Sequence, residues 1–267
     1  MSNDQLAGGR TGIIDAHVHT GNNVTAWRSD DAVADLAGCA RRVGIERLLV
    51  SVLGVDGYLA APGDTELRRA NALAEQVVAS DPIFAGQVYT SPDHVEASLE
   101  LMEKLIANGP FVGIKLWIAQ QASAPGCDPI VDYAAELGVP VLQHAWYKTT
   151  GQLSGESHPG HVAEMARRHP NAIIQMAHLY GAGERGVLDV VPYENVVIDT
   201  CGCEPEAGLL EFALNVLGPD RVLYGSDAPG RDFAVQLSKI NNADLSDDVR
   251  NKVLFGNARR LYRRLES

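Results

Sequence analysis

The sequence His17-Val18-His19 is the feature that most constrains this chain, and it directly follows the apolar run that begins at Gly12. Alternate residues of a β-strand point to the same side, so these two imidazoles leave one strand end side by side. A single His-x-His pair is a weak signal, because many surface segments contain one by chance. Three further side chains of metal-ligand type close later strand-like runs: His144, His178 and Asp227. Nitrogen and carboxylate ligands that converge from separate strands are typical of a catalytic metal site.

Short apolar runs alternate with longer amphipathic segments along the chain. Eight runs predict strands: Gly12–His17, Arg47–Leu53, Ile83–Tyr89, Val112–Trp117, Val139–His144, Ala172–Ala177, Val196–Asp199 and Arg221–Gly225. Eight segments that follow them predict helices: Asp31–Val43, Thr65–Ser80, Asp93–Asn108, Asp128–Leu137, Pro159–His169, Gly183–Val191, Pro205–Leu217 and Asp232–Asn242. A final helix is expected over Ser246–Leu265, because Ser246 is a good N-cap and acids follow it in the first turn. This alternation predicts parallel strands joined by crossover helices.

A closed (β/α)₈ TIM barrel and an open doubly wound sheet both have this alternation. Eight units in 267 residues fit the barrel, which commonly uses about 250 residues. The candidate ligands end the first, fifth, sixth and eighth strands, and only a closed barrel brings these four ends to one point. That point lies at the carboxyl face, where barrel active sites are built. The sequence has no internal repeat or linker, so we expect one domain over residues 1–267.

Composition and charge exclude several classes of protein. The formal net charge is −12, which argues against general nucleic-acid binding. The segment from Met1 to Arg10 lacks the pattern of a signal peptide, and no apolar run approaches the ~20 residues that span a bilayer. The four cysteines form no C-x-x-C pair, which favours reduced thiols in a cytoplasmic protein. We therefore expect a small-molecule substrate as the partner, and a homo-oligomer stays open.

Seven motifs carry a family resemblance that covers Gly12 to about Tyr262. They occur in the order IIDAHVHTG, GIKLW, VLQHAW, MAHLYG, VIDTCG, LYGSDAP and FGNARRLY. In this order they resemble the amidohydrolase superfamily, and more narrowly its amidohydrolase 2 branch. That branch contains lactone hydrolases, metal-dependent decarboxylases and hydratases, so the resemblance implies the barrel and leaves the reaction open.

The resemblance also implies a role for each strand-end residue. His17 and His19 match the metal-binding pair of the first strand, and His144 matches the ligand of the fifth strand. Asp227 matches the aspartate that contacts the metal and takes a proton from the bound water. His178 matches a histidine that acts on water or substrate in mononuclear members and binds a second metal in binuclear ones.

The chemistry of these residue types agrees with the assignment. Three neutral imidazoles and one carboxylate leave a divalent ion with net positive charge and an open position, where the pKa of water falls to roughly 7. The hydroxide formed would attack a carbonyl carbon, and Asp227 would return the proton to the leaving group. One ion, Zn²⁺ by default, with Mn²⁺ or another ion as the alternative, is the expected cofactor.

Substrate-binding residues are expected around the same point. Strand alternation in Gly113–Trp117 places Lys115 and Trp117 on the barrel side. Lys115 is either an unmodified cation that holds a substrate carboxylate or a carboxylated bridge that adds a second metal. Arg231 on the eighth loop is a further carboxylate ligand, and Trp146 is an aromatic wall. The loop Trp146–His158 has the glycine and serine content of a lid.

We therefore expect a metal-dependent hydrolase that acts on a small carboxylated or cyclic ester, lactone or amide. The alternative on the same scaffold is non-oxidative decarboxylation of an unsaturated or aromatic acid, a carbon–carbon lyase reaction. A third reading is a metal-free lactone hydrolase in which the histidines bind substrate. A binding protein without activity is disfavoured, because all five strand-end residues are intact.

Overall fold

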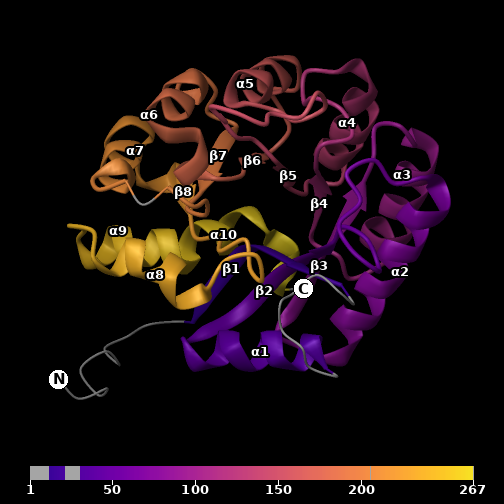
Figure 1. The fold of residues 1–267 in the computed structure, drawn as a ribbon, viewed down its shortest axis with the longest axis horizontal. Helices are drawn as coiled ribbons and strands as arrows, with labels where there is room; N and C mark the ends of the chain where they lie inside the picture. The colour runs from indigo at the N-terminus through magenta and orange to yellow at the C-terminus, as the bar shows by residue number, and fades with distance from the viewer. Residues whose placement is uncertain (1–11, 22–30, 205, 267) are drawn as a thin grey trace.

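The eight predicted strands form one parallel sheet in the order of the sequence (Figure 1). The structure is a computed structural model that describes residues 12–21, 31–204 and 206–266. The segment from Met1 to Arg10 lies outside the described residues. The strands are β1 (Ile13–Thr20), β2 (Ile45–Val52), β3 (Phe84–Thr90), β4 (Gly113–Leu116), β5 (Val141–Gln143), β6 (Ile174–Met176), β7 (Val196–Asp199) and β8 (Val222–Leu223).

The sheet closes into a barrel through the residues that follow the short strand β8. The Ala16 N–H donates to the carbonyl of Tyr224 at 3.0 Å, and the His19 N–H donates to the carbonyl of Ala228 at 2.7 Å. The Asp227 N–H donates to the carbonyl of His17 at 2.8 Å, so the first and last ligand-bearing segments are hydrogen-bonded to each other. The prediction of a closed (β/α)₈ barrel is confirmed.

Eight helices surround the strands (Figure 1). They are α1 (Ala32–Arg42), α2 (Asp64–Ser80), α3 (Val95–Met102), α4 (Asp128–Glu136), α5 (Pro159–Arg168), α6 (Leu179–Val190), α7 (Leu209–Leu217) and α8 (Phe233–Asn241). Helix α2 illustrates how they dock. Its buried residues Leu67, Ala70, Ala74 and Val77 recur every three or four positions and face β2 and β3.

Two helices differ from the sequence prediction in instructive ways. Helix α3 ends at Met102 and continues as a π-helical turn over Glu103–Ala107. Helix α6 was expected from Gly183, but the helical segment begins at Leu179, directly after His178. Gly183, with φ of 63°, and Tyr180 are not helical, so the segment is kinked where it passes the carboxyl face of the barrel.

The single helix expected over Ser246–Leu265 is wrong in its details. The structure has α9 (Asp247–Asn251), a π-helical turn over Lys252–Gly256, and α10 (Asn257–Leu261). The helix then ends at Tyr262, whose φ of −93° and ψ of 63° are not helical. Tyr262 is buried, and its hydroxyl donates to the side-chain oxygen of Gln175 inside the barrel at 2.6 Å. The α-helix therefore ends at Tyr262, and a 3₁₀ helix over Arg263–Glu266 follows it.

No helix within the described ranges is long and apolar enough to cross a membrane. All four cysteines are free, as their spacing predicted.

Candidate active site

Three of the predicted ligands meet at the carboxyl face of the barrel. His17 Nε2 lies 3.0 Å from His19 Nε2, and Asp227 Oδ1 lies 3.6 Å and 3.5 Å from these two atoms. Atoms that sit about 2.1 Å from one ion in tetrahedral geometry are about 3.4 Å apart. The three donor atoms are therefore spaced as ligands of a single ion are.

The chemistry of this donor set also fits a divalent ion. Asp199 Oδ2 lies 2.9 Å from His17 Nδ1 and accepts a hydrogen bond from its N–H. The lone pair of the His17 ring is therefore on Nε2. His19 Nδ1 lies 2.9 Å from the hydroxyl of Ser51. Burial lowers the pKa of both histidines below the usual value, which favours the neutral forms that bind metals. Two imidazole nitrogens and a carboxylate oxygen are ligands of Zn²⁺, Mn²⁺ and similar ions.

Asp199 orients the ring of His17, and the sequence analysis did not identify it as a site residue. Besides His17 Nδ1, its Oδ2 accepts from Gln175 at 2.9 Å, while its Oδ1 accepts from the backbone of His178 at 2.9 Å. Burial raises the pKa of the Asp199 carboxyl, but the contacts with His17 outweigh burial and hold the pKa below its usual range. Since Gln175 accepts the Tyr262 hydroxyl, a buried polar chain joins the C-terminal segment to the first metal ligand.

Gly225 shows how closely this support is packed. A Cβ atom on Gly225 would lie 2.9 Å from Cβ of His17 and 2.9 Å from Cβ of Asp199. Real Cβ atoms do not approach one another so closely, so only glycine fits between these two side chains. The glycine of the LYGSDAP motif therefore permits the contact that orients His17.

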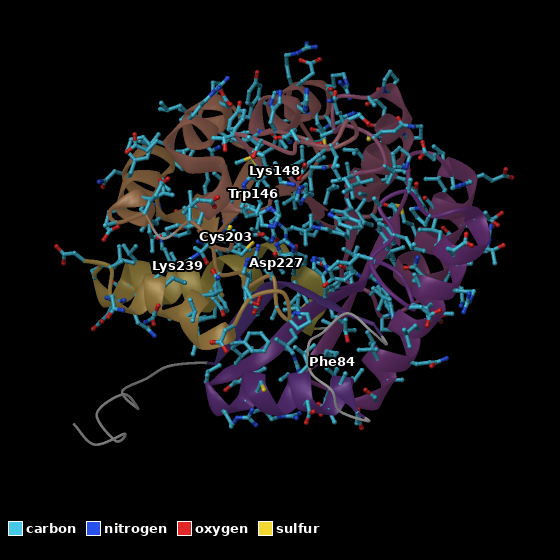
Figure 2. All side chains as sticks on the ribbon, in the orientation of Figure 1. Phe84, Trp146, Lys148, Cys203, Asp227 and Lys239 are labelled. Atoms are coloured by element: carbon cyan, nitrogen blue, oxygen red, sulfur yellow. The ribbon has the colours of Figure 1, made fainter. Side chains whose placement is uncertain are left out.

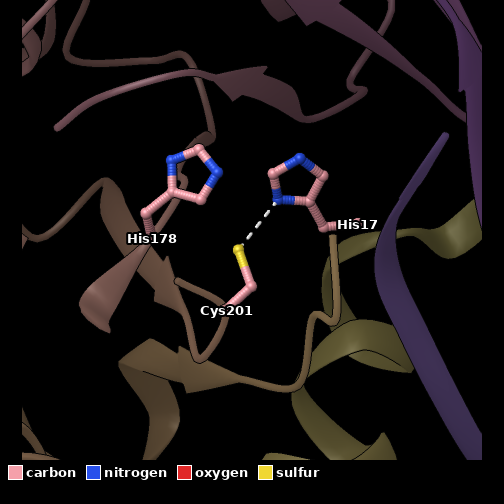
Figure 3. A group of neighbouring side chains, drawn as sticks. All are labelled: His17, His178 and Cys201. Carbon is pink, nitrogen blue, oxygen red and sulfur yellow. Dashed lines mark hydrogen bonds between the residues drawn. The ribbon is translucent and has the colours of Figure 1, made fainter. Parts of the chain in front are cut away.

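Cys201 lies beside the same histidine (Figure 3). Its Sγ is 3.3 Å from His17 Nδ1 and donates to Asp199 Oδ1 at 2.8 Å. His17, His178 and Cys201 thus form a second buried group of potential ligands. Burial raises the pKa of the thiol well above its usual value, so Cys201 serves Asp199 as a hydrogen-bond donor. Cys203 is exposed at the cavity, and the two cysteines are not paired.

His178 and Asp227 face each other across the site, with His178 Nε2 3.7 Å from Asp227 Oδ2. Burial raises the pKa of Asp227, but the contact with His178 and the neighbouring histidines outweigh burial, and the pKa is held far below its usual range. Asp227 is therefore an ionised acceptor beside an imidazole, the arrangement that a proton transfer requires.

His144 lines the same cavity as the three grouped donors, but its ring nitrogens are not part of that group. Its Nε2 is 2.8 Å from Oε1 of Glu156, and its ring makes an edge contact with His178 at 4.8 Å between centroids. Burial lowers the pKa of His144 to about 3, so the ring is neutral. Glu156, whose side chain is 1% exposed, was missed by sequence reasoning, because it lies in the loop after β5, where no periodicity marks a buried position.

Lys115 points into the barrel, as strand alternation predicted, and is buried. Its Nζ lies 3.3 Å from His17 Nε2, and it forms no ion pair with a described carboxylate. Burial lowers the pKa of Lys115 to about 8, against the opposing pull of Asp227 and Asp199. The amine therefore lies directly beside a candidate metal ligand, in a buried site that weakens its charged form.

A cavity of about 700 Å³ opens above these residues. The expected substrate-binding residues all line it: Lys115, Trp117, Trp146 and Arg231. Tyr58, a wall residue not predicted, makes edge contacts with the rings of His19 at 5.8 Å and Trp117 at 5.7 Å. Figure 2 shows Trp146 and Asp227 near the barrel centre, around which this cavity is built. Three cations line the cavity, Lys115, Lys148 and Arg231, together with the carboxylates of Glu204, Glu206 and Asp227. Aromatic walls and local cations of this kind can hold a flat anion.

A (β/α)₈ barrel with a His-x-His pair and an aspartate at its carboxyl face is the arrangement of a class of barrel enzymes that bind metal ions. A family model described as amidohydrolase matches residues 14–264, and the chain belongs to this amidohydrolase 2 family. The resemblance drawn from the sequence motifs is confirmed.

Solved structures with the same fold have low sequence identity to this chain. A 2,6-dihydroxybenzoate decarboxylase from Rhizobium is 19% identical with a TM-score of 0.77, covering 97% of this chain and 100% of its own. A dihydroxybenzoic acid decarboxylase from a Polaromonas species, with bound manganese and an inhibitor, is 18% identical with a TM-score of 0.70 and coverage of 95% and 97%. A 4-oxalomesaconate hydratase from Rhodopseudomonas palustris is 19% identical with a TM-score of 0.69 and coverage of 95% and 96%. A search of curated proteins finds no match.

Proposed function

We propose that this amidohydrolase is a metal-dependent enzyme in which one divalent ion is held by His17, His19, Asp227 and His144. The observation that carries the proposal is the spacing of 3.0 to 3.6 Å among the donor atoms of the first three residues. Nitrogen-rich ligation favours Zn²⁺, and Mn²⁺ is the second choice, since the Polaromonas relative binds it. When bound, the ion would polarise a substrate oxygen and activate water.

The protein residues divide the remaining work. Asp227 would take a proton from water and exchange it with His178, whose Nε2 is 3.7 Å from Asp227 Oδ2. Arg231 at the mouth and Lys115 at the floor of the cavity would bind a substrate carboxylate. Tyr58 and Trp117 would pack against the flat part of the substrate. We propose hydrolysis of a small carboxylated ester, lactone or amide as the first candidate reaction, because Asp227 is placed to take a proton from water beside His178.

Decarboxylation of an aromatic or unsaturated acid is the second candidate. The aromatic lining of the cavity supports it, because Tyr58, Trp117 and Trp146 offer more ring surface than a small aliphatic lactone requires. In that reaction His178 would protonate the carbon that loses carbon dioxide. The two decarboxylases with the same fold are both named for a dihydroxybenzoic acid as their own substrate.

Metal analysis followed by a substrate panel tests the proposal. Protein purified without added metal should contain about one divalent ion per chain, and a His17→Ala/His19→Ala variant should contain none. Lactones, esters and carboxylated aromatics are then assayed in water labelled with ¹⁸O. Labelled oxygen in the product supports hydrolysis, whereas carbon dioxide release supports decarboxylation. Activity that survives exhaustive chelation would reject the metal and favour the metal-free lactone hydrolase.

A further inference from the structure

We propose that Glu156 is a positioning residue for His144. In this role it holds the ring as the Nε2–H tautomer, so that Nδ1 is the nitrogen left to bind the metal. The inference rests on the proposed metal-dependent function and assigns a role to a residue that no strand-end motif contains. It also connects the loop over the cavity to the metal centre.

The first step concerns the bonds that Glu156 makes. The carboxylate is buried, and it lies on the loop between β5 and α5. Oε1 lies 2.8 Å from His144 Nε2 and 2.7 Å from Lys148 Nζ. Oε2 lies 2.9 Å from Lys148 Nζ and accepts from the backbone N–H of Leu153 at 3.1 Å. Three donors therefore converge on one buried carboxylate, which an ionised group requires.

The second step concerns the proton on His144. An ionised carboxylate only accepts hydrogen bonds, so the short contact with Glu156 needs a proton on His144 Nε2. A neutral imidazole carries one proton, which leaves the lone pair on Nδ1. A histidine that binds a metal ion does so in its neutral form, and Lys148 supplies the positive charge that balances the carboxylate. Carboxylate–histidine pairs of this kind fix the tautomer and orientation of metal ligands.

The third step concerns the loop. Trp146, Tyr147 and Lys148 line the cavity, and Glu156 closes the same loop back onto His144. Tyr147 is fastened separately, because its hydroxyl donates to Asp189 of α6 and its ring lies under the guanidinium of Arg185. The bond of Tyr147 to Asp189 and the bond of Glu156 to His144 are two hydrogen-bonded anchors of this loop, beside the contact of the Trp146 ring with His178 at 4.8 Å. Of these two anchors, that of Glu156 reaches His144. The two anchors can therefore be removed one at a time.

Histidine NMR on isotope-labelled, chelator-treated protein tests the tautomer directly, with His144→Asn to assign the resonance. The wild type should show His144 as the Nε2–H form, and Glu156→Ala should show a mixture or the Nδ1–H form. Mn²⁺ affinity, measured by competition with a chelator, should fall about 10–100-fold in Glu156→Ala. Glu156→Gln keeps an acceptor and should retain the tautomer, with a smaller loss of affinity.

Two matched variants separate this role from simple loosening of the loop. Lys148→Met removes another partner of the same carboxylate, and Tyr147→Phe removes the hydrogen bond to Asp189 while it keeps the ring under Arg185. Both should keep the Nε2–H form and bind Mn²⁺ within about threefold of the wild type, well inside the loss expected for an outer-shell ligand support. Equal losses in all three variants would overturn the inference, as would an Nδ1–H ring in the wild type. If the wild type binds no metal, the proposed function fails while the tautomer still decides the role of Glu156. If Glu156→Ala does not fold, Glu156→Gln and the wild-type tautomer decide it.

Discussion

His178 Nε2 lies 3.7 Å from Asp227 Oδ2, and these two are the non-glycine residues of the described chain with a left-handed backbone. Their φ angles are 73° and 61°, a conformation that costs about 1–3 kcal/mol for residues other than glycine. His178 follows β6 and Asp227 follows β8, and both side chains line the cavity at the carboxyl face of the barrel. The two residues to which we assign proton transfer therefore have a strained backbone, which lowers the stability of the fold.

Asparagine substitutions test this pairing, because asparagine tolerates the left-handed backbone. His178→Asn and Asp227→Asn should each lower kcat about 10²–10⁴-fold on the substrate found in the panel. The double variant should be no slower than the slower single variant, since two groups that act as a unit are not additive. Assays at saturating metal remove the contribution of Asp227 as a ligand. If the loss of kcat in the double variant equals the product of the two single losses, the two residues act independently.

The support of His17 gives a second prediction, about metal affinity. Asp199→Ala should weaken Zn²⁺ or Mn²⁺ binding about 10–100-fold, because no side-chain acceptor then fixes the proton on His17 Nδ1. Cys201→Ser keeps a donor to Asp199 and should change the affinity much less. Chelator competition on both variants measures the difference. A larger loss in Cys201→Ser than in Asp199→Ala would instead make the thiol a ligand.

The fold was predictable because a barrel repeats one local pattern. Each strand is a short apolar run and each helix is amphipathic, so periodicity locates them without long-range information. The strand-end residues His17 and Asp227 were predictable for the same reason, since parallel strands end at one face. The errors fall where tertiary contacts coincide with a change of backbone, as at Tyr262, which ends the last α-helix and is buried with its hydroxyl bonded to Gln175.

The unpredicted site residues are those whose position depends on tertiary contacts. Glu156 and Tyr58 lie in loops, and a loop has no period that marks one side chain as buried or cavity-facing. Asp199 is different, because it ends a predicted strand and strand alternation could have turned it toward the barrel. What the sequence did not indicate is its partner, since His17 is 182 positions away along the chain.

Asp15 gives a prediction about pH. It is buried, its Oδ1 accepts from the backbone of Ser226 at 3.0 Å, and its Oδ2 has no partner among the described residues. Burial raises its pKa from 3.8 to about 8. The folded state therefore holds a proton that the unfolded state releases, and this contribution to stability is present below about pH 4 and lost as pH rises toward 8.

Comparison with Asp15→Asn isolates this contribution. In chelator, the stability of the wild type relative to the variant should fall by up to about 1.4 kcal/mol per pH unit, and the difference should level off above the raised pKa. Denaturant unfolding across this range measures it. Histidines with lowered pKa values act in the opposite direction, but they are common to both proteins and cancel in the difference. Parallel stability curves would mean that Asp15 is ionised in the fold.

Lys115 decides between one metal and two. As an unmodified amine 3.3 Å from His17 Nε2, it places a cation beside the metal and opposes binding. Lys115→Met should then raise the affinity for the single ion, on the order of tenfold, and raise KM for a carboxylated substrate more than it lowers kcat. As a carboxylated bridge, Lys115 would instead hold the second ion, and the methionine variant would drop from two metals per chain to one. Metal analysis with the intact mass of the untreated protein separates the two states. The lack of an ion-pair partner among the described carboxylates favours the unmodified amine, because the substrate carboxylate would then complete its pairing.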